Sequence, residues 1–233
     1  MEITQFPLVA ESNQEQAAPS SLTQKAYRQL EELIVTLRIQ PGTVLSEAAL
    51  AQQLGIGRTP IREALQRLAR EALVQILPRR GILVSEMDVK RQLRLLEVRR
   101  ELERLMARLA ARRASAEERQ AFHEIARGMS EASEANDDLT FMRLDRRLNL
   151  LLCRAARNEF LANAMTLTHG LSRRFWYSHY KQAADLPLCA RLHAELSRAV
   201  GDGHSDQAAK ASENLMDYVE SFTRATLDLE AHV

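Results

Sequence analysis

Apolar residues recur every three or four positions over residues 22–37, 45–54 and 58–68, a spacing that predicts three short amphipathic helices. The second stretch opens at Ser46, a residue suited to cap a helix N-terminus. It closes at Gly55, which readily takes the left-handed conformation that ends a helix. Two short amphipathic helices on either side of a glycine turn predict a helix-turn-helix.

The third of these stretches carries polar residues at its start. Pro60 is tolerated only in the first turn of a helix, so we expect this helix to begin near Arg58 or Thr59. Arg58, Thr59 and Arg62 then project from its N-terminal end, where a helix lying in the major groove of DNA presents side chains to base edges. Taken alone, the pattern favours a plainer interpretation, in which the arginines are ordinary solvated helix residues.

Two β-rich runs follow this helix and reverse that preference. Residues 73–77 and 82–84 are short and rich in β-forming side chains, and the turn between them contains Arg79 and Arg80 ahead of Gly81. A hairpin with a basic turn directly after a helix-turn-helix predicts a winged helix-turn-helix. Its wing would reach the sugar-phosphate backbone or the minor groove.

From Met87 onward the pattern changes to long helical periods with few glycines or prolines. After a first helix, further helices are expected over 116–133, 138–155, 158–183, 188–202 and 206–229. Six helices predict an all-α bundle, a fold that commonly houses a ligand between its helices. The predicted class is therefore mainly α, with a disordered N-terminal arm at 1–20, a winged helix-turn-helix domain with an α/β wing at 21–86, and a six-helix effector-binding and dimerisation domain at 87–233.

Charge and cysteine content refine this picture locally. The net charge is only +1, but residues 22–86 contain nine Lys or Arg against six Glu, and most of the basic residues lie on the reading helix and the wing.

Cys153 and Cys189 lie in apolar helical stretches, which favours buried reduced thiols. Neither an apolar run of membrane-spanning length nor a signal-peptide pattern occurs, so we expect a cytoplasmic protein without a membrane partner.

The N-terminal part resembles the GntR superfamily of bacterial transcription regulators over most of residues 22–85. The specific element is Arg58-Thr59-Pro60-Ile61-Arg62-Glu63-Ala64-Leu65, and further matches are Pro41-Gly42, Leu45-Ser46-Glu47, Leu50-Ala51, Leu54-Gly55, Arg67-Leu68 and Arg80-Gly81. The resemblance implies binding to a double-stranded operator. The DNA-facing residues it implies are Arg58, Thr59, Arg62, Gly57, Ser46, Arg67, Arg79, Arg80 and Gly81.

Two departures from the family pattern limit what carries over. Gly57 stands where members usually have Ser or Thr, so a side-chain cap or phosphate contact is lost. Ala48 stands where some members carry a DNA-contacting arginine. We therefore expect operator affinity or operator sequence to differ from those of better-known relatives.

The helical part resembles the FCD ligand-binding domain of the FadR-type branch through residues spread along its length. The matches are Leu96-Glu97-Val98-Arg99, Leu102-Glu103, Ala110-Ala111, Asp145, Asn158, His193 and Ala199. This resemblance implies a small organic acid as effector. Family members often hold the acid through a divalent metal bound by one Asp and three His.

The metal ligands that this resemblance implies are incomplete. The Asp-x-x-x-His pair of the family reads Asp145 and Asn149 here, His193 matches the next ligand, and no histidine occurs from Ser205 to Glu230, where the last should fall. Amide oxygen binds zinc- or nickel-class ions poorly. Asp145 and His193 therefore form a degenerate metal site, and no cofactor is certain.

Three interpretations of Asp145, Asn149 and His193 stay open at this point. We favour direct polar contact with an organic effector, over a weakened metal site completed by water or ligand and over a purely structural role. Arg99 has two candidate partners, an effector carboxylate or Glu103 one helical turn away. The arginine- and aromatic-rich segment 173–177, flanked by histidines, would line a pocket or a dimer contact, although its Trp176 is more typical of a core.

Together these features predict a ligand-responsive regulator, expected to be a repressor, that binds a palindromic operator as a homodimer, because one short reading helix gives little specificity alone. One rival is an architectural DNA-binding dimer without an effector. The other is a metal-assisted enzyme, which is disfavoured because no Ser-His-Asp constellation, His-Glu-x-x-His motif or phosphate loop is found.

Overall fold

The computed structural model describes residues 21–183 and 185–230, which divide into two compact units. The first unit comprises the described chain up to Met87 together with residues 169–178. The second comprises residues 88–168 and the described chain from His179 onward. The arm predicted at 1–20 lies outside the described residues. No described helix is both long enough and apolar enough to cross a membrane.

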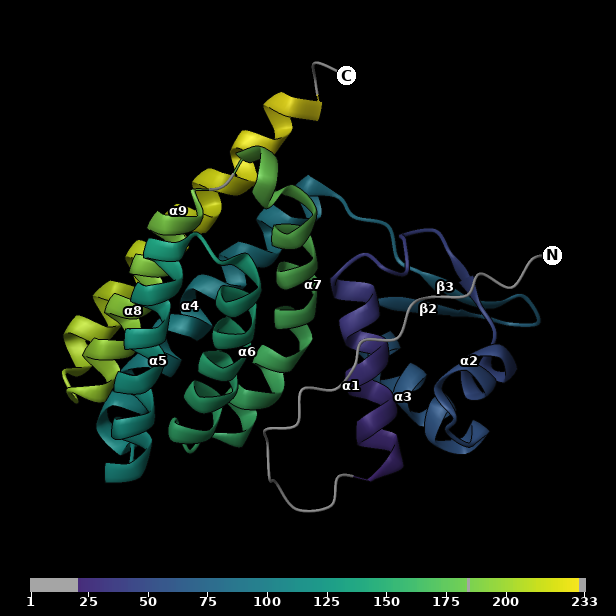
Figure 1. The fold of residues 1–233 in the computed structure, drawn as a ribbon, viewed down its shortest axis with the longest axis horizontal. Coiled ribbons are helices and arrows are strands. Elements are labelled where there is room, and N and C mark those ends of the chain that lie inside the picture. The colour runs from purple at the N-terminus through teal and green to yellow at the C-terminus, as the bar shows by residue number, and fades with distance from the viewer. Residues whose placement is uncertain (1–20, 184, 231–233) are drawn as a thin grey trace. The chain divides into compact units, whose positions relative to one another are not determined.

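The first unit combines short helices with a small antiparallel sheet (Figure 1). In chain order its elements are α1 (Leu22–Val35), β1 (Val44–Leu45), α2 (Glu47–Leu54), α3 (Arg58–Arg70), β2 (Val74–Leu77) and β3 (Gly81–Val84). The strands are arranged in the order β1-β3-β2, with Val44 opposite Leu83 and Val74 opposite Val84. Strand β1 was not predicted, because two residues are too short to show an alternating pattern.

The predicted apolar faces of α1, α2 and α3 meet in one core. Leu30 of α1 and Ile61, Leu65 and Leu68 of α3 are almost completely buried there, together with Leu50 of α2. Burial of such aliphatic side chains contributes about 1.5–3 kcal/mol each. This core fixes the orientation of α3 and so determines which residues of α3 remain outside.

Local chemistry places the helix ends close to where the sequence predicted them. Helix α2 ends at Leu54 and is followed by Gly55, its C-cap, which has a φ of 63°; α3 begins at Arg58 with Pro60 in its first turn. The Oγ of Ser21 caps α1 by accepting a hydrogen bond from the Gln24 N–H at 3.2 Å. Helix α1 ends at Val35, so Leu37, the last residue of the predicted apolar pattern, lies beyond the helix.

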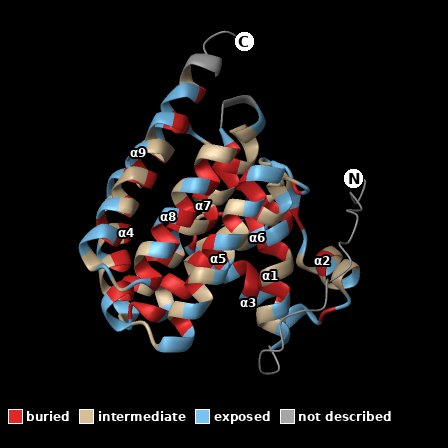
Figure 2. Ribbon diagram, turned by 60° about the vertical axis from the view of Figure 1, so that its left-hand side comes forward, coloured by how far each residue is buried: buried red, intermediate tan, exposed pale blue. Residues whose placement is uncertain are grey.

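The second unit is built from long helices, as predicted. They are α4 (Val89–Arg113), α5 (Ala116–Ala135), α6 (Asp138–Ala155), the two ends of α7 (Glu159–Ala183), α8 (Leu186–Gly201) and α9 (Ser205–Glu230). Helix α8 begins two residues before the predicted start, because Pro187 is accommodated in its first turn. Buried and exposed residues alternate along these helices at helical spacing (Figure 2), which is the amphipathic pattern from which they were predicted.

Helix packing within the second unit brings α4, α6, α8 and α9 together. Helix α4 packs along α9, α5 packs along α8, and α6 contacts α4, α5 and α8. Phe122, Ile125 and Met129 of α5 are fully buried, and the Ser197 hydroxyl of α8 donates to the Phe122 carbonyl at 2.8 Å.

The middle of α7 groups with the first unit, which the sequence did not predict. The Arg173 guanidinium pairs with the Glu31 carboxylate of α1 at 2.7 Å, and the buried Arg174 donates to the Ser85 carbonyl at 2.8 Å. At Gly170 a Cβ would lie 2.8 Å from a methyl carbon of Leu73, so the absence of a side chain permits this close packing. Trp176 is buried, in agreement with the prediction.

Candidate functional site

The N-terminal turn of α3 exposes the side chains that were predicted to read DNA. Arg58, Thr59 and Arg62 are all exposed, whereas Ile61 on the opposite side of the same turn is fully buried. Arg58 and Arg62 are four residues apart and therefore share one face of the helix. An outward-facing pair of arginines beside a threonine has the chemistry needed to bind base edges and phosphates.

Glu47, at the start of α2, holds Arg62. The Arg62 Nη2 lies 2.8 Å from Glu47 Oε2, and its Nε lies 3.1 Å from both carboxylate oxygens. These hydrogen bonds from Arg62 keep the pKa of Glu47 below its usual value. Arg62 remains 60% exposed despite the pair. Sequence reasoning matched Glu47 to the family but gave it no role, because its contact with Arg62 spans fifteen residues.

The wing places two basic side chains at the tip of a hairpin. Arg79 and Arg80 are exposed in the turn between β2 and β3, and Arg79 has a φ of 62°. Gly81 has a φ of 97°, and a Cβ there would lie 2.9 Å from the Leu45 carbonyl oxygen of β1. Because Gly81 has no side chain, β3 can pass close to β1.

Ser46 and Gly57, also predicted to face DNA, occupy the caps of α2 and α3. Both are exposed, and neither helix receives a side-chain cap bond from them. The first N–H groups of α2 and α3 are thus left without that capping contact, and helix N-termini of this kind attract phosphate.

Arg67 differs from the other predicted DNA-facing residues. Its Nε donates to Glu71 at 3.0 Å, its Nη1 donates to Gln24 at 3.2 Å, and its guanidinium carbon lies 3.6 Å from the centre of the Tyr27 ring. The Tyr27 hydroxyl also donates to Glu71, at 2.9 Å. These contacts hold α1 against α3, so we leave Arg67 out of the proposed DNA-contacting set.

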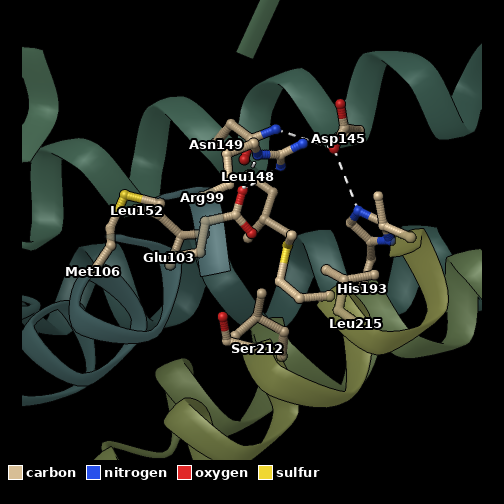
Figure 3. A pocket seen from close by; sticks show the side chains of 13 residues that line it. Arg99, Glu103, Met106, Asp145, Leu148, Asn149, Leu152, His193, Ser212 and Leu215 are labelled. Carbon is tan, nitrogen blue, oxygen red and sulfur yellow. Dashed lines mark hydrogen bonds and ion pairs between the residues drawn. The ribbon is translucent and has the colours of Figure 1, made fainter. Parts of the chain in front are cut away.

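A small cavity lies among α4, α6, α8 and α9 of the second unit (Figure 3). Its volume is about 30 Å³, and its lining includes all four residues predicted to bind an effector, namely Arg99, Asp145, Asn149 and His193. The apolar part of the lining is formed by Met106, Leu148, Leu152, Leu215, Met216 and Val219 among others. A cavity of this size has room for about two water molecules, so a larger ligand requires some of the lining to move.

His193 links α8 to α6 across the cavity. Its Nδ1 lies 2.8 Å from the Cys189 carbonyl oxygen, which can only accept, so Nδ1 carries a hydrogen and Nε2 faces Asp145 at 3.4 Å. Phe141 packs edge-on against the imidazole at 5.2 Å between ring centres. Burial lowers the pKa of His193, but Cys189 and the Asp145 carboxylate outweigh burial and raise the pKa well above its usual value.

Asn149 and Arg99 both have carboxylate partners within the cavity. The Asn149 Nδ2 donates to Asp145 Oδ1 at 3.0 Å, so its amide supports Asp145 from one helical turn away. The Arg99 guanidinium pairs with Glu103, with an Nε to Oε1 distance of 2.8 Å, and both side chains are nearly buried. Of the two partners considered for Arg99, Glu103 is the one it contacts in this structure.

The donor set does not fit a zinc- or nickel-class ion. Asp145 and His193 converge, but Asn149, which stands where the family has a histidine, carries an amide that donates to Asp145. Helix α9 contributes Ser212, Leu215 and Val219 where a histidine would be needed. Among the described residues, no group of three or more His, Cys, Asp or Glu side chains is arranged to hold a metal. Such ions ordinarily require three or four nitrogen, sulfur or carboxylate ligands.

Ser212 is a member of the cavity that sequence reasoning missed. It is 0% exposed, and its Oγ has no hydrogen-bond partner in the part of the chain that the structure describes. A serine in an amphipathic helix carries no distinctive signal, because its importance depends on what faces it from other helices.

Both cysteines are free thiols, as predicted. Cys189 is buried, and the half-buried Cys153 lies 3.5 Å from the Met106 sulfur. Burial raises the pKa of Cys153 to about 11.

A winged helix-turn-helix with an exposed reading helix, followed by an all-α unit with a polar cavity, defines a DNA-binding transcription regulator with a separate helical domain. Residues 22–84 match the model of the bacterial regulatory proteins of the gntR family, and residues 94–218 match the FCD domain. The chain therefore belongs to the GntR family of transcriptional regulators, in the branch that carries an FCD domain.

Known relatives are transcription regulators rather than enzymes. The chain is 46% identical over 65 residues to an HTH-type transcriptional regulator of Streptomyces ambofaciens, a match covering 28% of each protein. It is 25% identical over 201 residues to the HTH-type transcriptional repressor RspR of Escherichia coli K12, covering 86% of this chain and 88% of that one. The solved structure of E. coli McbR/YncC shares the fold, with a TM-score of 0.74 at 20% identity over 89% of this chain and 99% of that chain.

Proposed function

We propose that this protein is a cytoplasmic repressor that binds a palindromic operator as a homodimer and responds to a small organic acid. Arg58, Thr59 and Arg62 would enter the major groove, while Arg79 and Arg80 of the wing would contact the sugar-phosphate backbone. The observation that carries this proposal is the outward exposure of the α3 arginines over a buried helix face. The repressor role is supported by the name of the E. coli relative RspR.

A homodimer is proposed because a single reading helix covers too few base pairs to select one site. Two copies would place two α3 helices in successive major grooves, and the operator would share the two-fold symmetry of the protein.

The operator part of the proposal is tested by selecting duplexes from a random-sequence library with the full-length protein. We expect a palindromic site, and we expect Arg58→Ala and Arg62→Ala each to weaken specific binding by about 1–3 kcal/mol. Arg70→Ala is the matched control, since Arg70 is exposed at the opposite end of α3. Equal losses in all three variants, or no enriched site, would refute the assignment of the reading residues.

For the effector, we propose that it binds in the cavity around Asp145 and His193, without a zinc- or nickel-class ion. Effector and operator must favour different arrangements of the protein, so each changes the affinity for the other by the same factor. Gel-shift titrations in the presence of candidate carboxylic acids measure that factor. A compound that binds the protein but leaves operator affinity unchanged refutes the sensor role and favours a purely architectural DNA binder.

A further inference from the structure

The buried hydroxyl of Ser212 indicates that the cavity is built to hold a polar ligand. Ser212 lies on α9, lines the cavity, and has no partner for its Oγ among the described residues. A fully buried hydroxyl that makes no hydrogen bond is costly and rare in folded proteins. Figure 3 shows Ser212 on the α9 side of the cavity and Asn149 and Asp145 on the α6 side, and all three residues line the same cavity.

The side chains of the cavity form two pairs of opposite sign when the His193 imidazole is protonated, the form that the neighbouring Asp145 carboxylate favours. Arg99 contacts Glu103 within α4, and His193 of α8 contacts Asp145 of α6. All four side chains are largely withdrawn from solvent, so any charge that a ligand adds must be balanced inside the cavity.

This balance discriminates between ligand classes. A simple carboxylate adds a third anion to two cations that each already face a carboxylate. A simple amine adds a third cation in the same way. A molecule that carries one ammonium and one carboxylate leaves the buried charge unchanged. Its ammonium can contact the carboxylates of the lining, and its carboxylate can accept from the hydrogen-bond donors of the lining.

The remaining lining sets the character of the rest of the ligand. Leu148, Leu152, Leu215 and Met216 surround the polar groups, and the cavity volume is about 30 Å³. Methionine side chains rearrange easily around small apolar groups. A short aliphatic side chain suits this lining, whereas a second charged group does not.

We propose that the effector is a small aliphatic amino acid, whose ammonium contacts the carboxylates of Asp145 and Glu103 and whose carboxylate accepts a hydrogen bond from the Ser212 hydroxyl. This inference rests on the proposed function and narrows its organic acid to a zwitterion. It also makes Ser212 a ligand-binding residue, alongside Asp145 and His193.

The test compares three matched compounds on the full-length protein by isothermal titration calorimetry. L-Valine carries both charges, 3-methylbutanoate lacks the ammonium, and 2-methylpropylamine lacks the carboxylate; L-alanine with propanoate and ethylamine forms a second, smaller set. We expect the amino acid of at least one set to bind at least tenfold more tightly than its two counterparts.

Ser212→Ala provides the second measurement. We expect it to weaken amino acid binding by about two- to tenfold, the effect of one hydrogen bond. Without ligand, the variant should melt at the same temperature as the unsubstituted protein or higher, because the substitution removes a buried hydroxyl that has no hydrogen-bond partner. Ser221→Ala is the control, since Ser221 is exposed on the same helix and bonds the Asp217 carbonyl; it should change neither quantity.

The possible results separate this inference from the proposed function. If an acid or an amine binds as tightly as its matched amino acid, or if Ser212→Ala leaves amino acid binding unchanged, the zwitterion assignment is wrong while the effector role stands. If none of the compounds binds while selected operator DNA still does, the cavity is not a site for such ligands and the effector part of the proposed function also falls.

Discussion

The Arg62 guanidinium on α3 is clamped by both carboxylate oxygens of Glu47 on α2, at 2.8–3.1 Å. The bonds use the Nε and Nη2 edge of the guanidinium, so the edge that includes Nη1 is turned away from Glu47. A guanidinium held at one edge loses less rotational freedom when its other edge binds a guanine. Glu47 is therefore expected to position Arg62.

We expect Glu47→Gln to reduce the discrimination between the selected operator and an operator with altered guanines by about 1 kcal/mol. Affinity for non-specific DNA should hold or rise, because a negative charge near the phosphates is removed. Fluorescence anisotropy titrations with both duplexes measure the two effects.

Glu63→Gln is the matched control for this charge change. Glu63 is exposed on α3 and accepts a hydrogen bond from Thr23 at 2.6 Å. Similar losses of discrimination in the two variants would mean that charge alone, and not the clamp on Arg62, is responsible.

The wing should depend on Gly81 more strongly than the turn before α3 depends on Gly55. Both have positive φ, but a Cβ at Gly55 meets nothing within 4 Å, whereas at Gly81 it meets the Leu45 carbonyl oxygen at 2.9 Å. We expect Gly55→Ala to cost about 1 kcal/mol and Gly81→Ala about 2–4 kcal/mol, measured by urea unfolding. Equal costs would show that the wing adjusts to the added methyl group without strain.

Glu118 joins the start of α5 to the end of α6 and gives the helical unit a pH dependence. Its carboxylate accepts from Arg157 at 2.8 and 2.9 Å and from the Ser115 N–H at 3.0 Å. Burial raises the pKa of Glu118, but these hydrogen bonds outweigh burial and hold the pKa below its usual value. The stability it contributes is therefore present above the ordinary glutamate pKa and is lost as pH falls through the lowered folded pKa.

We expect Glu118→Gln to lower the free energy of unfolding by about 1–2 kcal/mol at pH 7, and we expect the difference from the unsubstituted protein to shrink below about pH 4. Urea unfolding at a series of pH values measures this. Glu117→Gln controls for the acid in the first turn of α5, because Glu117 is exposed and bonds the Ser115 hydroxyl. If the difference in the free energy of unfolding between Glu118→Gln and the unsubstituted protein stays constant down to pH 3, ionised Glu118 is not its source.

Asn149→His should restore a metal site. Asp145 Oδ1 lies 3.0 Å from Asn149 Nδ2 and 3.4 Å from His193 Nε2, so an imidazole at position 149 would complete a set of three converging ligands. We expect zinc or nickel to bind this variant at least tenfold more tightly than the unsubstituted protein, measured by competition with a chromophoric chelator. Arg147→His is the control, since Arg147 is exposed on the same helix and pairs with Glu124; equal affinities would show that Asp145 and His193 do not converge on position 149.

Features that depend on residues close together in the chain could be predicted from the sequence, whereas features that depend on distant residues could not. Long helices such as α6, predicted at its observed bounds, are specified by local periodicity, and the Arg99–Glu103 pair follows from a four-residue spacing. Strand β1 depends on pairing with a distant strand. The contact between Arg62 and Glu47 and the unpaired hydroxyl of Ser212 likewise depend on residues that only folding brings close together. No local sequence pattern predicts them.

The chemistry of the native thiols makes this protein convenient for site-directed labelling. Burial raises the pKa of Cys153 to about 11, so its thiol is protonated and unreactive at pH 7, and Cys189 is 1% exposed. The chain contains no other cysteine. A maleimide dye on a cysteine introduced in place of Gln75, which is exposed on β2, would therefore report on the wing during DNA binding without prior removal of either native cysteine.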